Sequence, residues 1–136
     1  MAANLNTPLL SLVATGDIRP SRFVSMSTAA DFTVAESNAG DWVLGVSQIG
    51  TRDTPGLSGA GTDAAQTGES LHIFANGQLA WLECGTTITR ADILKPDNDG
   101  KAIVGTTGVY YGAQALESGV SGDLITVIVT IGELET

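Results

Sequence analysis

Two residues could supply a catalytic imidazole or thiol, because the 136-residue chain contains one histidine, His72, and one cysteine, Cys84. A catalytic thiol needs a base within hydrogen-bond reach. If residues 69–84 form a β-hairpin, Cys84 lies opposite Glu69, on the face away from His72. We therefore interpret His72 as a cross-strand neighbour of Trp81 and Cys84 as a small buried apolar residue. The sequence predicts no enzyme activity, and a single cysteine excludes an intrachain disulfide.

Two glycine-containing segments resemble ligand-binding loops without meeting their requirements. Asp97-Asn98-Asp99-Gly100 resembles part of a calcium loop, but Lys95 stands where the first ligand belongs and the glutamate at position twelve is missing. We interpret this segment as a turn. Residues 56–61 contain scattered glycines but no Gly-Lys-Ser/Thr, so a phosphate-binding loop is not predicted. The remaining carboxylates are interpreted as solvated turn and strand-edge groups. We expect no metal and no cofactor.

Composition narrows the function classes further. The net charge is −9, 43% of residues are hydrophobic and only 15% are charged. The six basic residues are scattered along the chain, which disfavours nucleic-acid binding, because that binding depends on clustered Lys and Arg. Residues 1–15 lack the features of a secretory signal. No apolar run reaches the about 20 residues that a membrane helix needs, so no membrane partner is expected.

Short apolar segments separated by Gly, Asn, Asp and Ser predict an all-β fold, a small β-barrel or β-tulip-like domain with long loops and an N-terminal arm. We predict a flexible arm at residues 1–8 and a single β domain at residues 9–136, with the longest irregular loop at residues 50–68. Residues 86–94 are interpreted as irregular. The expected strands are residues 9–14, 22–27, 32–36, 42–47, 101–104, 110–116 and 124–131, together with a hairpin within residues 69–84.

The pair Asn76-Gly77 favours a type I′ hairpin turn between two apolar runs. This turn would place Phe74 opposite Leu79 and His72 opposite Trp81. Both faces of such a hairpin are apolar, so we expect another surface to cover the outer one. The residues predicted to form that subunit interface are His72, Phe74 and Trp81.

One sequence pattern occurs twice in the chain. It consists of an apolar stretch with Gly, a spacer with Ala, and a Gly followed by a carboxylate residue just before an apolar strand. The first copy ends in Gly68-Glu69 and the second in Gly122-Asp123. Glycine permits a sharp reversal at such a position, and the acid can accept backbone hydrogen bonds. The second copy leads into residues 124–131, whose density of β-branched residues predicts a central strand with Ile125, Val127, Val129 and Ile131 on one face.

The order and spacing of several short motifs resemble the small head-decoration, or capsid cement, proteins of tailed bacteriophages. The motifs are Arg22-Phe23-Val24, Val43-Leu44-Gly45-Val46, Ala64-Ala65 with Gly68-Glu69, Asp92-Ile93-Leu94-Lys95, Asp99-Gly100-Lys101, and Gly112-Ala113-Gln114-Ala115-Leu116-Glu117 with Gly122-Asp123. The resemblance covers the chain from about Gly16 to the C-terminus.

The resemblance implies a virion protein on the outer surface of the capsid, commonly trimeric, that locks neighbouring major capsid proteins together and has no catalytic residues. We expect the arm and the long loop to contact those neighbours. An alternative is a virion-surface adhesin that binds host glycan or protein. The residues predicted to contact the capsid or neighbouring subunits are Ala2, Asn4, Leu5, Leu9, Leu10, Arg52 and Leu57.

Overall fold

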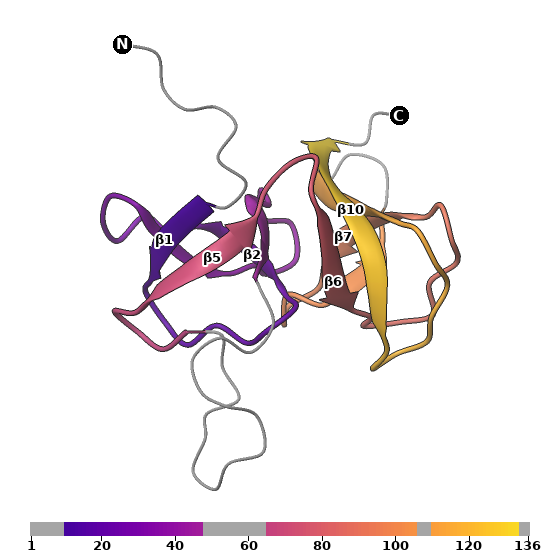
Figure 1. Cartoon of the computed structure of the whole chain (residues 1–136), viewed down its shortest axis with the longest axis horizontal. Helices are drawn as coiled ribbons and strands as arrows, with labels where there is room; N and C mark the ends of the chain where they lie inside the picture. Colours follow the sequence, from indigo (N-terminus) through magenta and orange to yellow (C-terminus); the bar gives the residue numbers. More distant parts are fainter. Residues whose placement is uncertain (1–9, 48–64, 106–109, 134–136) are drawn as a thin grey trace, which may run out of the picture.

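The computed structural model describes residues 10–47, 65–105 and 110–133, and this part of the chain forms ten strands and no helix (Figure 1). The all-β class predicted from the sequence is confirmed. The strands are β1 (Leu10–Ala14), β2 (Phe23–Met26), β3 (Thr33–Glu36), β4 (Gly45–Ser47), β5 (Ser70–Phe74), β6 (Leu79–Glu83), β7 (Ile93–Pro96), β8 (Ala102–Val104), β9 (Tyr110–Ala115) and β10 (Leu124–Glu133).

The first five strands close into a barrel in the order β1-β3-β2-β4-β5. Strand β1 pairs in parallel with β3 and antiparallel with β5, which closes the ring. The last five strands form a second sheet in the order β6-β10-β9-β7-β8. Figure 1 shows these two units side by side, the barrel on the left and the second sheet on the right.

The second sheet repeats the topology of the barrel. If β6 to β10 are matched in sequence with β1 to β5, every antiparallel neighbour in one unit has its counterpart in the other. The parallel pair β1–β3 corresponds to a single parallel bridge between Cys84 and Ala102. This one bridge is what joins the two edges of the second sheet. The chain is therefore a tandem repeat of one five-stranded unit, which we call the first and second units.

The repeat extends to the turns. Ile18 and Ile88 are both buried, and each exchanges backbone hydrogen bonds with its bridge partner, Ala65 and Gly119 respectively. The glycines of the repeated sequence pattern, Gly68 and Gly122, have φ of 86° and 92°. An L-residue rarely adopts such backbone angles, which explains why both copies need Gly before the acid.

The predicted hairpin at residues 69–84 is wrong. Asn76 does not have the positive φ that a type I′ turn requires, whereas Gly77 has φ of 92°, which fits a type II turn. A type II turn splays the flanking strands. Strand β5 accordingly pairs with β1 and β4, and β6 pairs with β10, so the residue 75–78 connection joins two units instead of two paired strands.

The connection itself is anchored on β10. The Gly77 N–H donates to the Val129 carbonyl at 2.7 Å, the Val129 N–H donates to the Gln78 carbonyl at 2.8 Å, and the Ile131 N–H donates to Asn76 Oδ1 at 3.1 Å. The inward and outward faces predicted for the two strands are correct even though their pairing is not. Leu71, Ile73, Ala80 and Leu82 are buried, and His72, Leu79 and Trp81 are exposed.

Strand β7 contradicts the prediction that residues 86–94 are irregular and that Pro96 belongs to a turn. Ile93 and Leu94 pair with β9, while Leu94 to Pro96 pair with β8. Proline cannot donate a ladder hydrogen bond, so its presence argued against a strand. Pro96 is tolerated because the pairing of β7 with β9 ends at Leu94, and Pro96 pairs only with Ala102 on β8.

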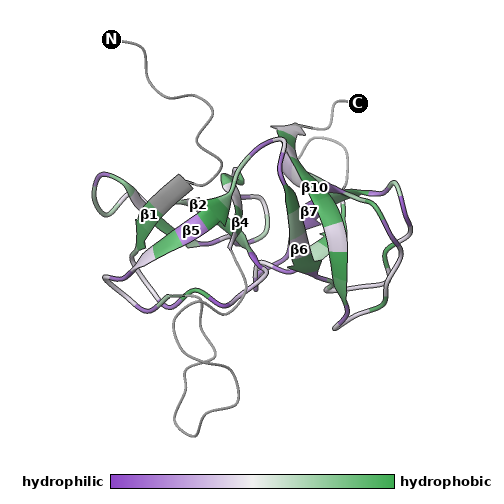
Figure 2. Cartoon of the chain, viewed as in Figure 1, coloured by the Kyte–Doolittle hydropathy of each residue, from purple (hydrophilic) through white to green (hydrophobic). Residues whose placement is uncertain are grey.

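The buried side chains form two clusters that account for the apolar strands visible in Figure 2. One fills the first unit. The other fills the second unit, including Ile125, Val127 and Val129 of β10, and also takes in Phe23, Val43 and Val46 from the first unit. Strand β10 lies in the interior of its sheet, between β6 and β9. The two units therefore pack against each other through an apolar contact.

Candidate functional site

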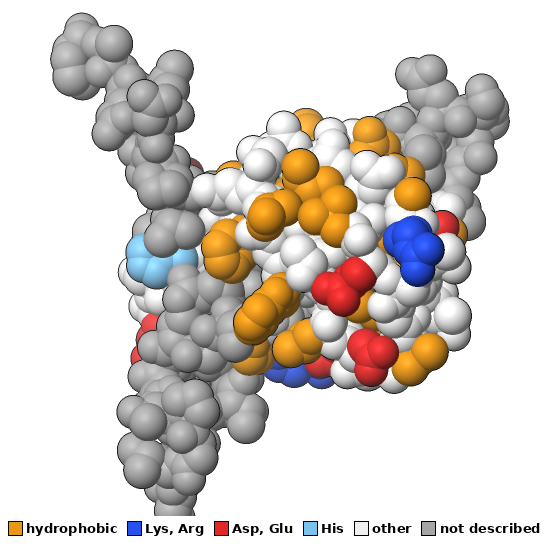
Figure 3. All heavy atoms as spheres, turned by 45° about the vertical axis from the view of Figure 1, so that its right-hand side comes forward, with side chains coloured by type: hydrophobic (Ala, Val, Ile, Leu, Met, Phe, Trp, Pro, Cys, Tyr) orange, Lys and Arg blue, Asp and Glu red, His pale blue; other side chains and the backbone are white. Residues whose placement is uncertain are grey.

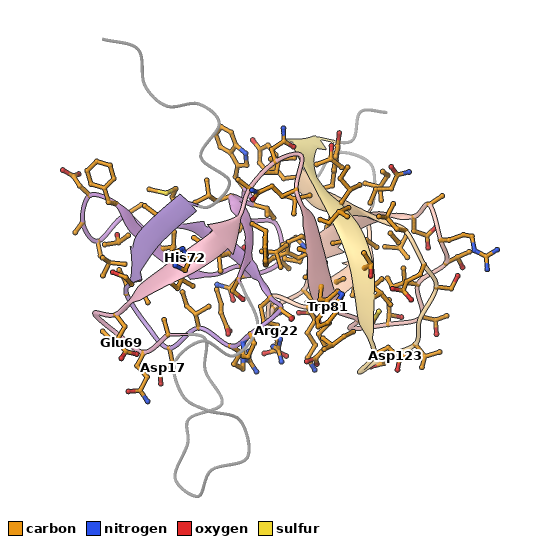
Figure 4. The ribbon with its side chains drawn as sticks, in the orientation of Figure 1. Asp17, Arg22, Glu69, His72, Trp81 and Asp123 are labelled. Carbon is orange, nitrogen blue, oxygen red and sulfur yellow. The ribbon has the colours of Figure 1, made fainter. Side chains whose placement is uncertain are left out.

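Most of the predicted capsid-contact residues lie outside the described part of the chain: Ala2, Asn4, Leu5, Leu9, Arg52 and Leu57. Leu10 opens β1, where its backbone pairs with that of Ile73 on β5. The three residues predicted to share an interface do not share a face. His72 is exposed on β5, Trp81 is 54% exposed on β6, and Phe74 is half-buried against the second core cluster. Figure 4 shows His72 and Trp81 on different units, so they are not cross-strand neighbours.

Cys84 is fully buried in the second core cluster. Burial raises the pKa of its thiol to about 11, and the nearby charges of Asp123 and Glu83 act in the same direction. A thiol in this environment is not ionised at neutral pH, and the thiolate is the nucleophilic form. The interpretation of Cys84 as a small buried apolar residue is confirmed.

The segment from Asp97 to Lys101 is a turn, as predicted. One Asp97 carboxylate oxygen, Oδ1, accepts hydrogen bonds from the Asp99 and Lys101 N–H groups at 2.8 and 2.9 Å. Its carbonyl accepts the Gly100 N–H at 3.1 Å. Within residues 10–47, 65–105 and 110–133, no three His, Cys, Asp or Glu side chains gather as a metal site would require. No helix in the same ranges is long and apolar enough to span a membrane.

One sheet surface of the second unit is exposed and apolar. Leu79, Trp81 and Leu124 point outward from β6 and β10 and are 59%, 54% and 50% exposed. The register places Trp81 opposite Thr126 and Leu79 opposite Ile128, on the same surface. We call this surface, made by Leu79, Trp81, Leu124 and Ile128, the β6–β10 face. Figure 3 shows several hydrophobic side chains near one another on the face that is turned forward.

The matching surface of the first unit has a different chemistry. Strand β5 corresponds to β10, and its outward positions carry Ser70 and His72 where β10 carries Leu124 and Thr126, while Phe74 and Ile128 are apolar and half-buried in both copies. Two copies of one architecture need the same buried residues but not the same outer ones. The apolar character of the β6–β10 face is therefore not a requirement of the fold, and large exposed apolar patches mark interaction sites.

A polar cluster lies between the two units. Arg22 is 7% exposed, and its Nη1 donates to the Asp99 carbonyl at 2.9 Å while Nη2 lies 3.4 Å from Glu83 Oε1. Glu83 also forms an ion pair with Lys101 at 3.3 Å. The Glu83 N–H donates to the Ser21 carbonyl at 3.0 Å. We call this cluster the junction; Figure 4 shows Arg22 between the two units.

Arg19 lies beside the junction and is held by Glu36. Its Nε and Nη2 atoms donate to the two Glu36 carboxylate oxygens at 3.0 and 2.9 Å. This bidentate pair raises the pKa of the Arg19 guanidinium, which is charged throughout the working range in any case. Sequence reasoning did not identify Arg19 or Arg22 as site residues, because no motif signals that two distant turns will meet.

A cavity of about 460 Å³ opens at the junction. Its lining residues are Arg19, Pro20, Ser21, Arg22, Glu83, Gly122 and Leu124. Ser21 and Arg22 also carry two buried side-chain atoms without a hydrogen-bond partner, Ser21 Oγ and Arg22 Nε, and both atoms are sealed from solvent. Native proteins rarely leave such atoms unpaired.

A second hollow of about 510 Å³ lies beside Trp42, and its lining includes Met26, Asp41 and Leu44. Trp42 is 68% exposed and stacks on Tyr110 of the second unit, with ring centroids 5.8 Å apart and an interplanar angle of 15°. The stack therefore links the two units on the surface.

The described residues thus define a small all-β protein with two matching five-stranded units, a polar junction and an exposed apolar sheet face. The fold is shared with the N base of head fiber gp8.5 of bacteriophage phi29, whose crystal structure superposes with a TM-score of 0.57 at 18% identity. The match covers 94% of this chain and 98% of that one. No family model matches the chain, and no curated protein matches it.

Proposed function

We propose that this chain is a structural protein of a bacteriophage head, bound to the outer surface of the capsid, where it stabilises contacts between major capsid proteins. The observation that carries the proposal is the fold common to nearly the whole of this chain and to the base of a phage head fiber. The sequence motifs that resemble capsid cement proteins support the same assignment independently.

The β6–β10 face is the surface we assign to capsid or subunit contact. Burying exposed apolar surface stabilises an association by roughly 25 cal/mol per Å², before the costs of ordering are subtracted. Aromatic residues such as Trp81 are frequent anchors of interfaces. Of the three residues first assigned to a subunit interface, Trp81 is the one whose side chain lies on this face; Phe74 already packs against its own core.

A trimer would make the binding multivalent. One subunit with an interface of under about 1,000 Å² binds weakly, but three linked subunits that contact several capsid proteins gain effective concentration. A protein that binds only the mature lattice stabilises that lattice by mass action. The segments we propose as additional contacts are residues 2–10 and the residues 50–63 loop, with Arg52 and Leu57 in the loop.

The test combines two measurements. Sedimentation equilibrium gives the mass of the purified chain, and co-sedimentation with capsids assembled from the major capsid protein of the same phage gives its binding. We expect a trimer and saturable binding. A monomer that stays in the supernatant at micromolar concentration would refute the proposal. Deletion of residues 2–7 should lower occupancy; unchanged occupancy and unchanged particle melting would remove the arm from the contact.

A second candidate is an adhesin that binds host glycan. The observation that favours it is the exposed Trp42–Tyr110 stack beside a hollow lined in part by Asp41, since small-molecule sites combine aromatic side chains with a few polar groups. Binding of the isolated protein to a glycan array, abolished by Trp42→Ala, would support this function. Binding that requires capsids would support the first.

A further inference from the structure

The first unit docks onto the second through one cross-strand row of side chains. Phe23 on β2 pairs with Val46 on β4, and Val46 pairs with Phe74 on β5. Directly paired residues share one face of a sheet. Phe23 and Val46 belong to the core cluster of the second unit, and Phe74 packs against that cluster. We call these three residues the first row.

The repeat places an equivalent row on the second unit. Because β2, β4 and β5 match β7, β9 and β10, the same cross-strand pairings recur there. We call the residues at these positions the second row: Ile93, Gln114 and Ile128. All three are half-buried, whereas the residues that β2 and β4 contribute to the first row are fully buried. Ile128 pairs with the exposed Leu79, so the second row continues into the β6–β10 face.

The second row has the character of a surface that lacks its partner. In stacked repeats each unit contacts the next with the same surface, and the last unit usually carries a polar outer face. Here two of the three residues are isoleucine. The second row and the β6–β10 face contain no charged residue, although the chain has a net charge of −9. Like charges brought together oppose association, so two copies of this chain approach most easily through an uncharged surface.

The first unit has the matching receiving end. In the second unit, the first row is received at β9, where a Cβ on Gly112 would lie 2.7 Å from Phe23 Cε1. Tyr110, two residues earlier, stacks on Trp42. Since β4 matches β9, the counterparts of Gly112 and Tyr110 are Leu44 and Trp42. Both line the hollow of about 510 Å³ on the first unit, and Trp42 is 68% exposed. We call this hollow the receiving end.

We propose that the second row of one copy docks head to tail on the receiving end of a second copy of this chain. The contact repeats between copies the arrangement that joins the two units within the chain. A head-to-tail contact forms a ring if the rotation between copies closes, and the trimer expected above is a ring of three such contacts. This inference rests on the proposed function, for which it names the partner of the apolar sheet face.

The contact within the chain also includes two backbone hydrogen bonds. The Glu83 N–H donates to the Ser21 carbonyl at 3.0 Å, and the Phe23 N–H donates to the Gly100 carbonyl at 2.8 Å. The start of β2 thus lies between two groups of the second unit that would otherwise face each other. These bonds hold the two units together permanently.

The same two bonds are not available between copies. At the receiving end, the groups that match Glu83 and Gly100 bond to each other, the Val13 N–H to the Phe32 carbonyl at 3.0 Å. Beside the second row, Gln114 Nε2 donates at 3.1 Å to the Ala91 carbonyl, which matches that of Ser21. The contact between copies is therefore apolar, and it is weaker than the contact within the chain.

The first test locates the contact by cross-linking. Ile93→Cys and Leu44→Cys are made in separate full-length proteins, mixed, and treated with a short bismaleimide. Ile93 and Leu44 match Phe23 and Gly112, which lie together within the chain, so we expect cross-linked dimers from the mixture and none from either variant alone. Cys84 is fully buried and does not compete. A mixture without product overturns the proposal, and so does cross-linking of Ile93→Cys with itself, which would show a face-to-face contact.

The second test uses two substitutions in the second row with opposite expected signs. Ile93→Ser should weaken self-association about tenfold, because it removes apolar area from the contact. Gln114→Val reproduces the Val46 of the first row and should strengthen self-association about tenfold. Val104→Ser is the control, since Val104 is 42% exposed on β8 of the same unit and lies outside the row. Sedimentation equilibrium without capsids measures all three, and dissociation constants unchanged by both row substitutions would overturn the proposal.

Capsid binding separates this inference from the proposed function. If Ile93→Ser keeps the mass of the parent and loses capsid binding, the second row contacts the capsid and the inference is overturned. A protein that binds capsids as a monomer refutes this inference alone. A protein that forms the head-to-tail ring but binds no capsid refutes the proposed function alone.

Discussion

Glu69 and Asp123 hold the two copies of one turn in the same way. The Glu69 carboxylate accepts the Gln66 N–H at 2.7 Å, and the Asp123 carboxylate accepts the Val120 N–H at 3.0 Å. Each acid follows a glycine with positive φ and precedes the last strand of its unit. The turns are therefore equivalent parts of a duplicated unit, and each can be tested through its glycine.

Gly122→Ala should lower the free energy of unfolding by about 1–2 kcal/mol, because an L-residue is strained at φ of 92°. A Cβ at this position would meet no atom within 4 Å, so the loss isolates the backbone effect. Urea denaturation measures it. Gly16→Ala is the control, since Gly16 is equally open but has no positive φ. Equal stability of the two variants would contradict the assigned turn.

Gly112→Ala should destabilise the contact between the two units. A Cβ there would lie 2.7 Å from Phe23 Cε1 and 2.7 Å from Val43 Cγ1, both in the first unit. Overpacking of this kind costs about 1–3 kcal/mol. Thermal unfolding followed by circular dichroism checks the loss. A variant as stable as the parent would mean that the two units do not pack as described.

The thiol of Cys84 should resist labelling in the native protein. Burial raises its pKa to about 11, so at pH 8 Ellman's reagent should react on unfolding and only very slowly before it. The raised pKa also predicts a pH dependence. Its contribution to stability is complete below the ordinary thiol pKa of 9.0 and is lost as the pH rises toward 11. Cys84→Ala should flatten that part of the stability curve; rapid native labelling at pH 8 would show that the side chain is accessible.

Glu117 should contribute to stability at neutral pH and not in acid. Its carboxylate accepts the Thr126 N–H at 2.8 Å, which lowers the pKa of Glu117 below its ordinary value of 4.5. For a lowered pKa the stabilisation is complete above that ordinary value and disappears as the pH falls through the pKa of the folded state. Melting temperatures of the parent and Glu117→Gln should therefore differ at pH 7 and converge in acid. A constant difference across this range would count against the hydrogen bond.

Trp81→Ser should weaken association while changing stability by no more than about 1 kcal/mol, because the side chain is more than half exposed on the β6–β10 face. Capsid co-sedimentation and sedimentation equilibrium measure the two forms of association. Phe32→Ser is the matched control, since Phe32 is 74% exposed on the first unit. If both variants bind like the parent, the β6–β10 face is not the contact surface.

Most of the strands and the repeated sequence pattern could be predicted from the sequence, because each is indicated by residues close together in the chain. Alternating residues along β5, β6 and β10 indicated the buried faces correctly, and Gly before an acid indicated both turns. What could not be predicted is which strands pair. Asn76-Gly77 occurs in more than one turn type. A type I′ turn would have paired β5 with β6, whereas the type II turn leaves them unpaired and in different units.

The junction could not be predicted for a related reason. Arg22 and Asp99 are far apart in the sequence, and their contact depends on how the second unit lies against the first. No local pattern carries that information. The predicted arm at residues 1–8 lies outside the described residues, and the division of the chain into an arm and a single domain stays a prediction.

The short connection between β5 and β6 has a mechanical consequence. Four residues join the units, and this connection is bonded to β10: the Gly77 N–H donates to it, while Asn76 Oδ1 and the Gln78 carbonyl accept from it. A direct bond from the Phe23 N–H to the Gly100 carbonyl, 2.8 Å long, crosses between the units elsewhere. A force applied to one unit is transmitted to the other through these hydrogen bonds, because no long flexible linker separates the two units. The hydrogen bonds between the units therefore resist a force that would pull the units apart.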